Sequence, residues 1–153
     1  MEALCNLTRQ EGLSEFSAIS GYSDFSEGQA SRWIQKELDR FRAHRLGKFA
    51  VVLKESGYPI GISGLFQSYA PHEADVELNY RYPKVYRGKG FATEAAQAIL
   101  QYGFDELGLK KIFANADLRN VDSRAVLHRL GMKQIGEVSY GGIQAGRWVL
   151  ECK

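Results

Sequence analysis

The chain has 153 residues, 44% of them hydrophobic and 25% charged, which is the composition of one soluble globular domain large enough for its own core. Its 20 basic and 18 acidic residues give a formal net charge of +2, a balance that favours no class of charged partner. Two cysteines make no disulfide framework, and the sequence has neither an apolar run of about 18 residues nor a signal peptide, so we expect a cytoplasmic protein with no membrane span.

The N-terminal part of the chain predicts two helices. Residues 2–16 carry a weak helical pattern, and a loop rich in small polar residues follows over 17–25. A second helix begins after Ser26, because Gln29 stands three residues later, as in a capping box. Its apolar positions form one stripe, and we expect Gly47 to end it.

Three strands are predicted next. Residues 49–55 and 60–66 flank a turn sequence ending in Tyr58-Pro59, which indicates a hairpin. Residues 75–82 alternate between polar and apolar side chains, so that every second residue shares a face of the strand. One face carries four apolar or aromatic residues, and the other carries Glu77, Asn79 and Arg81.

The remaining residues predict a helix over 90–107, a strand over 111–117 and a helix over 121–130. Gly108 is placed to cap the first of these helices. Two final strands, over 132–139 and 145–152, flank a Gly141-Gly142 turn. We therefore predict an α/β (α+β) fold in a single domain, residues 1–153, with a mixed, mostly antiparallel sheet of about six strands and about four helices.

The sequence Tyr-Arg-Gly-Lys-Gly-Phe-Ala-Thr at residues 86–93 joins a predicted strand to a predicted helix. Helix N-termini expose unpaired backbone N–H groups, and glycine lets a backbone approach an anion closely. Arg87 and Lys89 add positive charge, so the segment predicts a phosphate-binding turn. Thr93 replaces the third glycine of a dinucleotide-binding fingerprint, and the P-loop pattern is absent. Taken alone, the segment also fits a solvated surface turn.

Three segments together carry a family resemblance. They are Glu77-Leu-Asn-Tyr-Arg-Tyr-Pro, Arg87-Gly-Lys-Gly-Phe-Ala-Thr-Glu-Ala and Asn120-Val-Asp-Ser-Arg-Ala-Val-Leu-His-Arg-Leu-Gly-Met. In this order they resemble the GNAT superfamily of N-acetyltransferases, over roughly residues 48–150, and most of all the branch that acetylates ribosomal-protein N-termini and related amines. Arg87, Gly90 and Ala92 satisfy the family's cofactor signature [Q/R]-x-x-G-x-[G/A].

The resemblance implies a sheet that splays at an acetyl-CoA site. The pyrophosphate would lie on the glycine turn, and the pantetheine arm would pair with the backbone of the preceding strand, where Asn79 stands at a position that is often glycine and permits a bulge. Asn120 would contact the pantetheine amide. The implied cofactor-binding residues are Tyr80, Arg81, Tyr82, Arg87, Gly88, Lys89, Gly90, Phe91, Ala92, Thr93, Asn120 and Ser123.

The implied reaction is direct transfer of an acetyl group from acetyl-CoA to a primary amine. An amine with a pKa of about 8 to 10 is mostly protonated near neutrality, so a base must take a proton. Glu77 matches the family's glutamate base, with a solvated strand charge as the alternative. Leu127 stands where many members have a tyrosine acid. Ser123 matches a serine that hydrogen-bonds the cofactor sulfur, with an ordinary helix serine as the alternative.

Several expectations concern the acceptor and other partners. Family members begin with a strand, which here is missing or irregular, so the acceptor pocket depends on residues such as Tyr22 and Phe25, or His72 in a channel. The acceptor classes are a protein N-terminus, a polyamine or an amino sugar. The histidines do not have the spacing of metal ligands, so we expect no metal site. No nucleic-acid motif accompanies the basic stretch 81–89, so we expect no nucleic-acid partner. The sequence leaves a homodimer open, and also a non-catalytic acyl-CoA-binding module.

Overall fold

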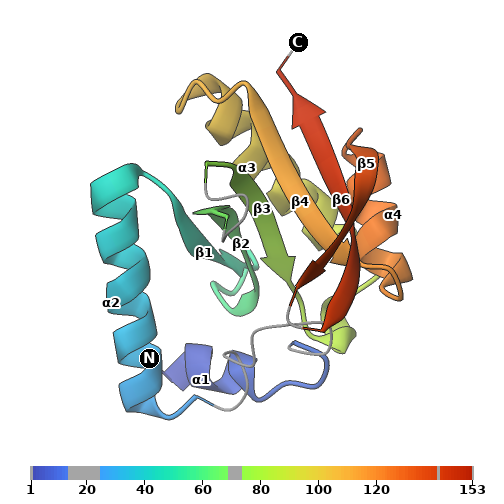
Figure 1. Ribbon diagram of the computed structural model, residues 1–153. Helices are drawn as coiled ribbons and strands as arrows, with labels where there is room; N and C mark the ends of the chain where they lie inside the picture. Colours follow the sequence, from blue (N-terminus) through green and yellow to red (C-terminus); the bar gives the residue numbers. More distant parts are fainter. Residues whose placement is uncertain (1, 14–24, 69–73, 141, 153) are drawn as a thin grey trace.

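The computed structural model describes residues 2–13, 25–68, 74–140 and 142–152 (Figure 1). The order of helices and strands is the one that the sequence predicts. In chain order, the elements are α1 (Glu2–Thr8), α2 (Glu27–His44), β1 (Gly47–Val52), β2 (Pro59–Gln67), β3 (Val76–Arg81), the short 3-10 helix η1 (Lys84–Tyr86), α3 (Phe91–Asp105), β4 (Lys111–Asp117), α4 (Val121–Arg129), β5 (Lys133–Tyr140) and β6 (Ile143–Glu151).

The strands form one six-stranded sheet in the order β1-β2-β3-β4-β6-β5. All neighbours are antiparallel except β3 and β4, which run parallel. Between these two, only Glu77 and Phe113 are in register, whereas β4 and β6 stay paired from Lys111↔Glu151 to Asp117↔Ala145. The sheet is therefore mixed, mostly antiparallel and open between β3 and β4, which confirms the predicted fold class.

Two helical layers cover the two faces of the sheet. The helices α3 and α4 lie behind it, while α1 and α2 lie against β2 and β1 (Figure 1). The main core, between the sheet and α3 and α4, contains Leu65, Leu78 and Leu127. A smaller core packs α1 and α2 onto Ile62 of β2. The apolar face of β3 thus points to α3 and α4, and its polar face points to the other side.

The helix that the capping box predicts has the expected start. Ser26 accepts a hydrogen bond from the backbone N–H of Gln29, and the Gln29 side chain accepts one from the backbone N–H of Ser26. The predicted end is wrong: Arg45 takes the left-handed conformation (φ 56°) that ends α2, and Gly47 begins β1. The predicted helix over 2–16 is also too long, because α1 ends at Thr8.

The bulge that asparagine at position 79 permits does not form. The register between β2 and β3 is continuous from Ile62↔Arg81 through Gly64↔Asn79 to Gln67↔Val76. The side chains of β3 therefore alternate without interruption, and Glu77, Asn79 and Arg81 share the face away from α3 and α4.

Candidate active site

A cavity of about 1110 Å³ extends from the N-terminus of α3, through the gap between β3 and β4, to one face of α2. It exceeds the roughly 300–1,000 Å³ of a typical small-molecule pocket, and so has room for a large ligand or for two ligands. Its lining comes from elements that are far apart in the sequence, and the open edge between β3 and β4 brings them together.

The glycine turn forms one end of this cavity. Gly88 and Gly90 have φ values of 71° and 86°, which favour glycine, and an added Cβ at either one would meet nothing within 4 Å. Gly90 is the N-cap of α3 and no side chain caps the helix, so the first backbone N–H groups have no side-chain acceptor. An anion in the cavity would therefore find backbone donors and the positive end of the helix dipole.

Arg87 fixes this turn to the rest of the molecule. Its Nε donates to the Tyr82 carbonyl at 3.1 Å, and its Nη2 donates to the Gly12 carbonyl at 2.5 Å. The guanidinium therefore ties the segment after α1 to the segment after β3. Lys89 differs from the other predicted cofactor residues, because it does not line the cavity and its Nζ lies 5.9 Å from the centre of the Tyr86 ring.

The gap between β3 and β4 brings Tyr80 next to the first turn of α4. The hydroxyls of Tyr80 and Ser123 are 2.9 Å apart, and Tyr80 also donates to the Ser123 carbonyl at 3.1 Å. Burial raises the pKa of the Tyr80 phenol above its usual value, so the phenol keeps its proton. Asn120 caps α4 by accepting from the Ser123 backbone N–H at 3.0 Å. Leu127, one helical turn further, is buried in the apolar core.

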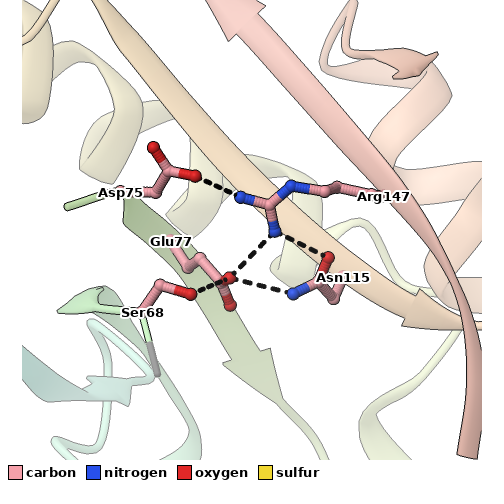
Figure 2. A network of polar contacts seen from close by, with 5 residues as sticks. All are labelled: Ser68, Asp75, Glu77, Asn115 and Arg147. Carbon is pink, nitrogen blue, oxygen red and sulfur yellow. Dashed lines mark hydrogen bonds and ion pairs between the residues drawn. The ribbon is translucent and has the colours of Figure 1, made fainter. Parts of the chain in front are cut away.

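The side chain of Glu77 is the centre of a buried polar network (Figure 2). Its Oε1 accepts hydrogen bonds from Ser68 Oγ at 2.5 Å, Asn115 Nδ2 at 2.9 Å and Arg147 Nη1 at 3.2 Å. The other arm of Arg147 binds Asp75 at 2.5 Å. All three bonds to Glu77 end on Oε1, and Oε2 accepts none from the residues that the structure describes.

Glu77 is only 6% exposed, so the alternative of a solvated charge on the strand surface is wrong. Arg147 is equally buried, and its guanidinium lies 4.5 Å from the centre of the Phe113 ring. Burying these charges is costly unless they are paired and hydrogen-bonded. Hydrogen bonds from Ser68, Asn115 and Arg147 compensate the buried charge at Oε1, whereas Oε2 accepts no hydrogen bond from the residues that the structure describes.

The far end of the cavity is lined by residues that the sequence did not single out. They come from one face of α2 and from β1. Glu37 is buried there, where it accepts hydrogen bonds from Arg40 Nη1 at 2.6 Å and from the Lys48 backbone N–H at 3.1 Å. The signal for this group is weak, because Trp33, Lys36, Glu37 and Arg40 read as an ordinary amphipathic helix. Asn115 and Arg147 carried a stronger signal, as polar residues in otherwise apolar strands.

All the predicted catalytic and cofactor-binding residues apart from Lys89 line this one cavity. Of the predicted acceptor residues, Phe25 does not line it. Phe25 is buried in the small core, with its ring centre 6.5 Å from that of Trp33, so it serves packing. Tyr22 and His72 lie outside the described residues.

Two other features were sought within the described ranges. No group of three or more metal-binding side chains occurs among these residues. The described helices also include none that combines the length and the apolar character needed to cross a membrane.

Comparisons with known proteins address the family that the sequence motifs predict. Residues 1–133 match the model of the acetyltransferase (GNAT) domain. The uncharacterized N-acetyltransferase YnaD of Bacillus subtilis is 32% identical over 112 residues, which span 73% of this chain and 62% of YnaD. The spermidine N(1)-acetyltransferase of Escherichia coli K12 is 36% identical over 55 residues, or 36% of this chain and 30% of that protein.

Among solved structures, the ribosomal-protein-S5-alanine acetyltransferase of Vibrio fischeri has the same fold. Its TM-score is 0.80 at 17% identity, over 98% of this chain and 87% of that one. The family that the three sequence motifs predict is thus confirmed. The chain belongs to the GNAT family of acetyltransferases.

Proposed function

We propose that the protein is an N-acetyltransferase that moves an acetyl group from acetyl-CoA directly to a primary amine. The observation that carries this proposal is one cavity lined by an anion-binding turn, a buried carboxylate with an unused oxygen and a hydroxyl pair. Acyl transfer to an amine needs these three functions: a place for the donor, a base, and a hydrogen-bond donor for the leaving thiolate.

The residues of the turn fit the donor. The uncapped start of α3 and the two glycines offer backbone N–H groups to the pyrophosphate, without side chains in the way. The edge of β3 faces the gap to β4 and offers backbone groups to the pantetheine amides. Acetyl-CoA supplies the activated thioester, and the protein supplies its orientation. Arg87 acts by holding the turn in place through the Gly12 and Tyr82 carbonyls.

Glu77 is the proposed base. Three donors hold Oε1, so the carboxylate has one orientation and Oε2 is available to take the proton from the amine nitrogen. Once it has lost that proton, the nitrogen forms a bond to the thioester carbon. The carbon–sulfur bond then breaks, and the leaving thiolate takes the second proton of the nitrogen, which gives the amide and the free thiol. The first proton goes to Glu77, and from there to solvent.

Ser123 is proposed to stabilise the leaving thiolate. Its hydroxyl can donate to the sulfur when the Tyr80 phenol turns its one proton from the Ser123 carbonyl to the Ser123 hydroxyl oxygen, which lies 2.9 Å away. Tyr80 is then a positioning residue. Since burial raises the pKa of its phenol, Tyr80 stabilises by hydrogen bonding and does not give up its proton.

The proposed acceptor is a protein N-terminus, a polyamine or an amino sugar. The E. coli relative is named for spermidine, and that match covers only 36% of this chain, so it does not choose among the three. The second candidate function is an acyl-CoA-binding module without activity, since Leu127 occupies the position of the usual tyrosine acid. It predicts thermal stabilisation by coenzyme A and no acetyl transfer.

A thiol-release assay with acetyl-CoA and a panel of N-terminal peptides, polyamines and amino sugars tests the proposal. We expect amine-dependent release of coenzyme A, with an acetylated product of the matching mass. Stabilisation by coenzyme A without release for any amine would favour the binding module instead.

A further inference from the structure

We propose that the side-chain amide of Asn79 donates a hydrogen bond to the thioester carbonyl oxygen and stabilises the negative charge that develops there during transfer. This inference rests on the proposed function and adds a residue to its mechanism. It gives Asn79 a catalytic role, whereas the sequence predicted only a backbone irregularity at this position.

The first observation is that the amide of Asn79 has no partner. Its Oδ1 is buried without a hydrogen bond, and its Nδ2 makes none within the described part of the chain. Most buried polar side-chain atoms form hydrogen bonds, so the unpaired Oδ1 indicates that the described residues do not hold this amide in place. Asn79 also lines the cavity, where its Nδ2 can donate to an oxygen of a bound substrate.

The second observation concerns the strand opposite Asn79. Its cross-strand neighbour on β2 is Gly64, which has no side chain to contact the amide. Gly64 has to be glycine, because a Cβ there would lie 2.1 Å from the Gly47 carbonyl oxygen. No side chain from the position directly opposite on β2 therefore covers the Asn79 amide.

The third observation is the order of residues along β3. Glu77 and Asn79 are on the same face, about 7 Å apart along the strand, and the chain then runs on to the glycine turn. A donor molecule anchored at the turn extends back along β3 toward Glu77. The attacked carbon must lie next to an amine held by Glu77, and its oxygen then lies within reach of Asn79.

The reaction needs a hydrogen-bond donor at the thioester carbonyl oxygen. When the amine nitrogen bonds to the thioester carbon, the carbonyl oxygen becomes negatively charged, and a preorganised N–H group lowers the barrier. A β-bulge would free a backbone N–H for this purpose, but β3 has a continuous register with β2. The amide of Asn79 is a side-chain donor that is already placed on the strand and not engaged elsewhere.

The test uses two variants with different chemistry. N79L has a similar size and no polar atom, and N79D has the same shape with a carboxylate in place of the donor NH₂. We expect kcat with the best amine to fall about 100-fold in N79L, and further in N79D, where negative charge faces the oxyanion. The KM for the amine and the affinity for coenzyme A should change less than about threefold.

The melting temperature separates a catalytic role from a structural one. Replacing a buried amide that has no partner by leucine removes a desolvation penalty, so the Tm of N79L should equal or exceed that of the parent. Q144L, on an exposed position of β6 away from the cavity, is the matched amide-to-leucine control, with parent kcat.

Each other outcome contradicts the proposal. Unchanged kcat in N79L removes Asn79 from the mechanism. A raised KM with unchanged kcat assigns the amide to amine binding instead, and a lowered Tm with parent kcat makes it structural. A parent protein that turns over no amine removes the proposed function together with this inference. A parent that does turn over, with variants equal to it, removes the inference alone.

Discussion

At the residue scale, the arrangement around Glu77 depends on which of its oxygens is occupied. Ser68, Asn115 and Arg147 all donate to Oε1, so the carboxylate is oriented by three elements at once while Oε2 stays open to a substrate. Arg147 also separates Glu77 from Asp75, since its two arms bind one carboxylate each. Without the guanidinium, two acidic groups would share a mostly buried site with no positive charge between them.

The variant R147M measures the importance of this separation. Removing one partner of a buried ion pair leaves uncompensated charge, so we expect the free energy of unfolding to fall by about 3 kcal/mol. For a domain of this size the Tm would then drop by roughly 6 to 12 °C. Thermal melts at neutral pH give the comparison. The control is K111M, because the Lys111–Glu151 pair is more than half exposed, and we expect no measurable change in its Tm. An R147M Tm equal to that of the parent would contradict the structural role of the network.

At the element scale, the connection between β4 and α4 places Asn120 and Ser123. Asp117 ends β4 and accepts three hydrogen bonds from Arg119: one from the backbone N–H at 2.9 Å and two from the guanidinium at 3.0 and 2.6 Å. The Asp117 side chain is buried and Arg119 is largely exposed. These bonds fix the turn immediately before the N-cap of α4, and thus the approach of Ser123 to Tyr80.

The pH dependence of stability tests this connection. Hydrogen bonding from the Arg119 side chain lowers the pKa of Asp117 below its usual value. A lowered folded-state pKa stabilises the protein above the ordinary carboxyl pKa of about 4, and this contribution is lost as the pH falls through the folded-state value. We expect D117N to melt a few degrees below the parent at pH 6 and 7, with the difference shrinking on acidification below about pH 4. A difference that stays constant over that range would rule out the ionised carboxylate as its source.

The pairing of β1 with β2 depends on the absence of a side chain at Gly64. A Cβ at this position would lie 2.1 Å from the Gly47 carbonyl oxygen and 2.7 Å from the Lys48 Cα, both of which are backbone atoms that cannot turn aside. We expect G64A to be destabilised by about 3 kcal/mol or more, as for overpacking in a core. Denaturant unfolding measures the change. The matched control is G136A in β5, where an added Cβ meets nothing within 4 Å, and it should unfold like the parent. Equal stability of G64A and G136A would contradict the close packing of β1 on β2.

On the scale of the whole molecule, the sequence predicted the elements well because their signals are local. The Ser26 capping box and the alternation over 75–82 each depend on residues that are close together in the sequence, and the structure has the corresponding helix and strand. The end of α2 was predicted wrongly, because Arg45 adopts a left-handed conformation that few non-glycine residues take. The bulge left open at Asn79 does not form, because pairing with β2 along the whole strand overrides the tolerance of asparagine for unusual angles.

The candidate site was predictable where a motif within a continuous segment marks it. The turn at 86–93 lies in a continuous stretch, so its glycines and the helix start could be read together. The network around Glu77 could not, because Asn115 and Arg147 come from strands 38 and 70 residues further along the chain, and they meet Glu77 only through the sheet order. The far end of the cavity, lined by residues of α2 and β1, has no motif at all.

The account as a whole places the donor at the glycine turn and the base at Glu77, within one cavity. The most direct measurement of this claim is amine-dependent acetyl transfer by the parent and E77Q, followed from pH 6 to pH 9, with coenzyme A affinity measured by calorimetry. We predict that kcat/KM for the amine falls about 100-fold or more in E77Q, most strongly at low pH, where the amine is protonated, with coenzyme A affinity unchanged. Equal transfer by E77Q and the parent across this range would contradict the account.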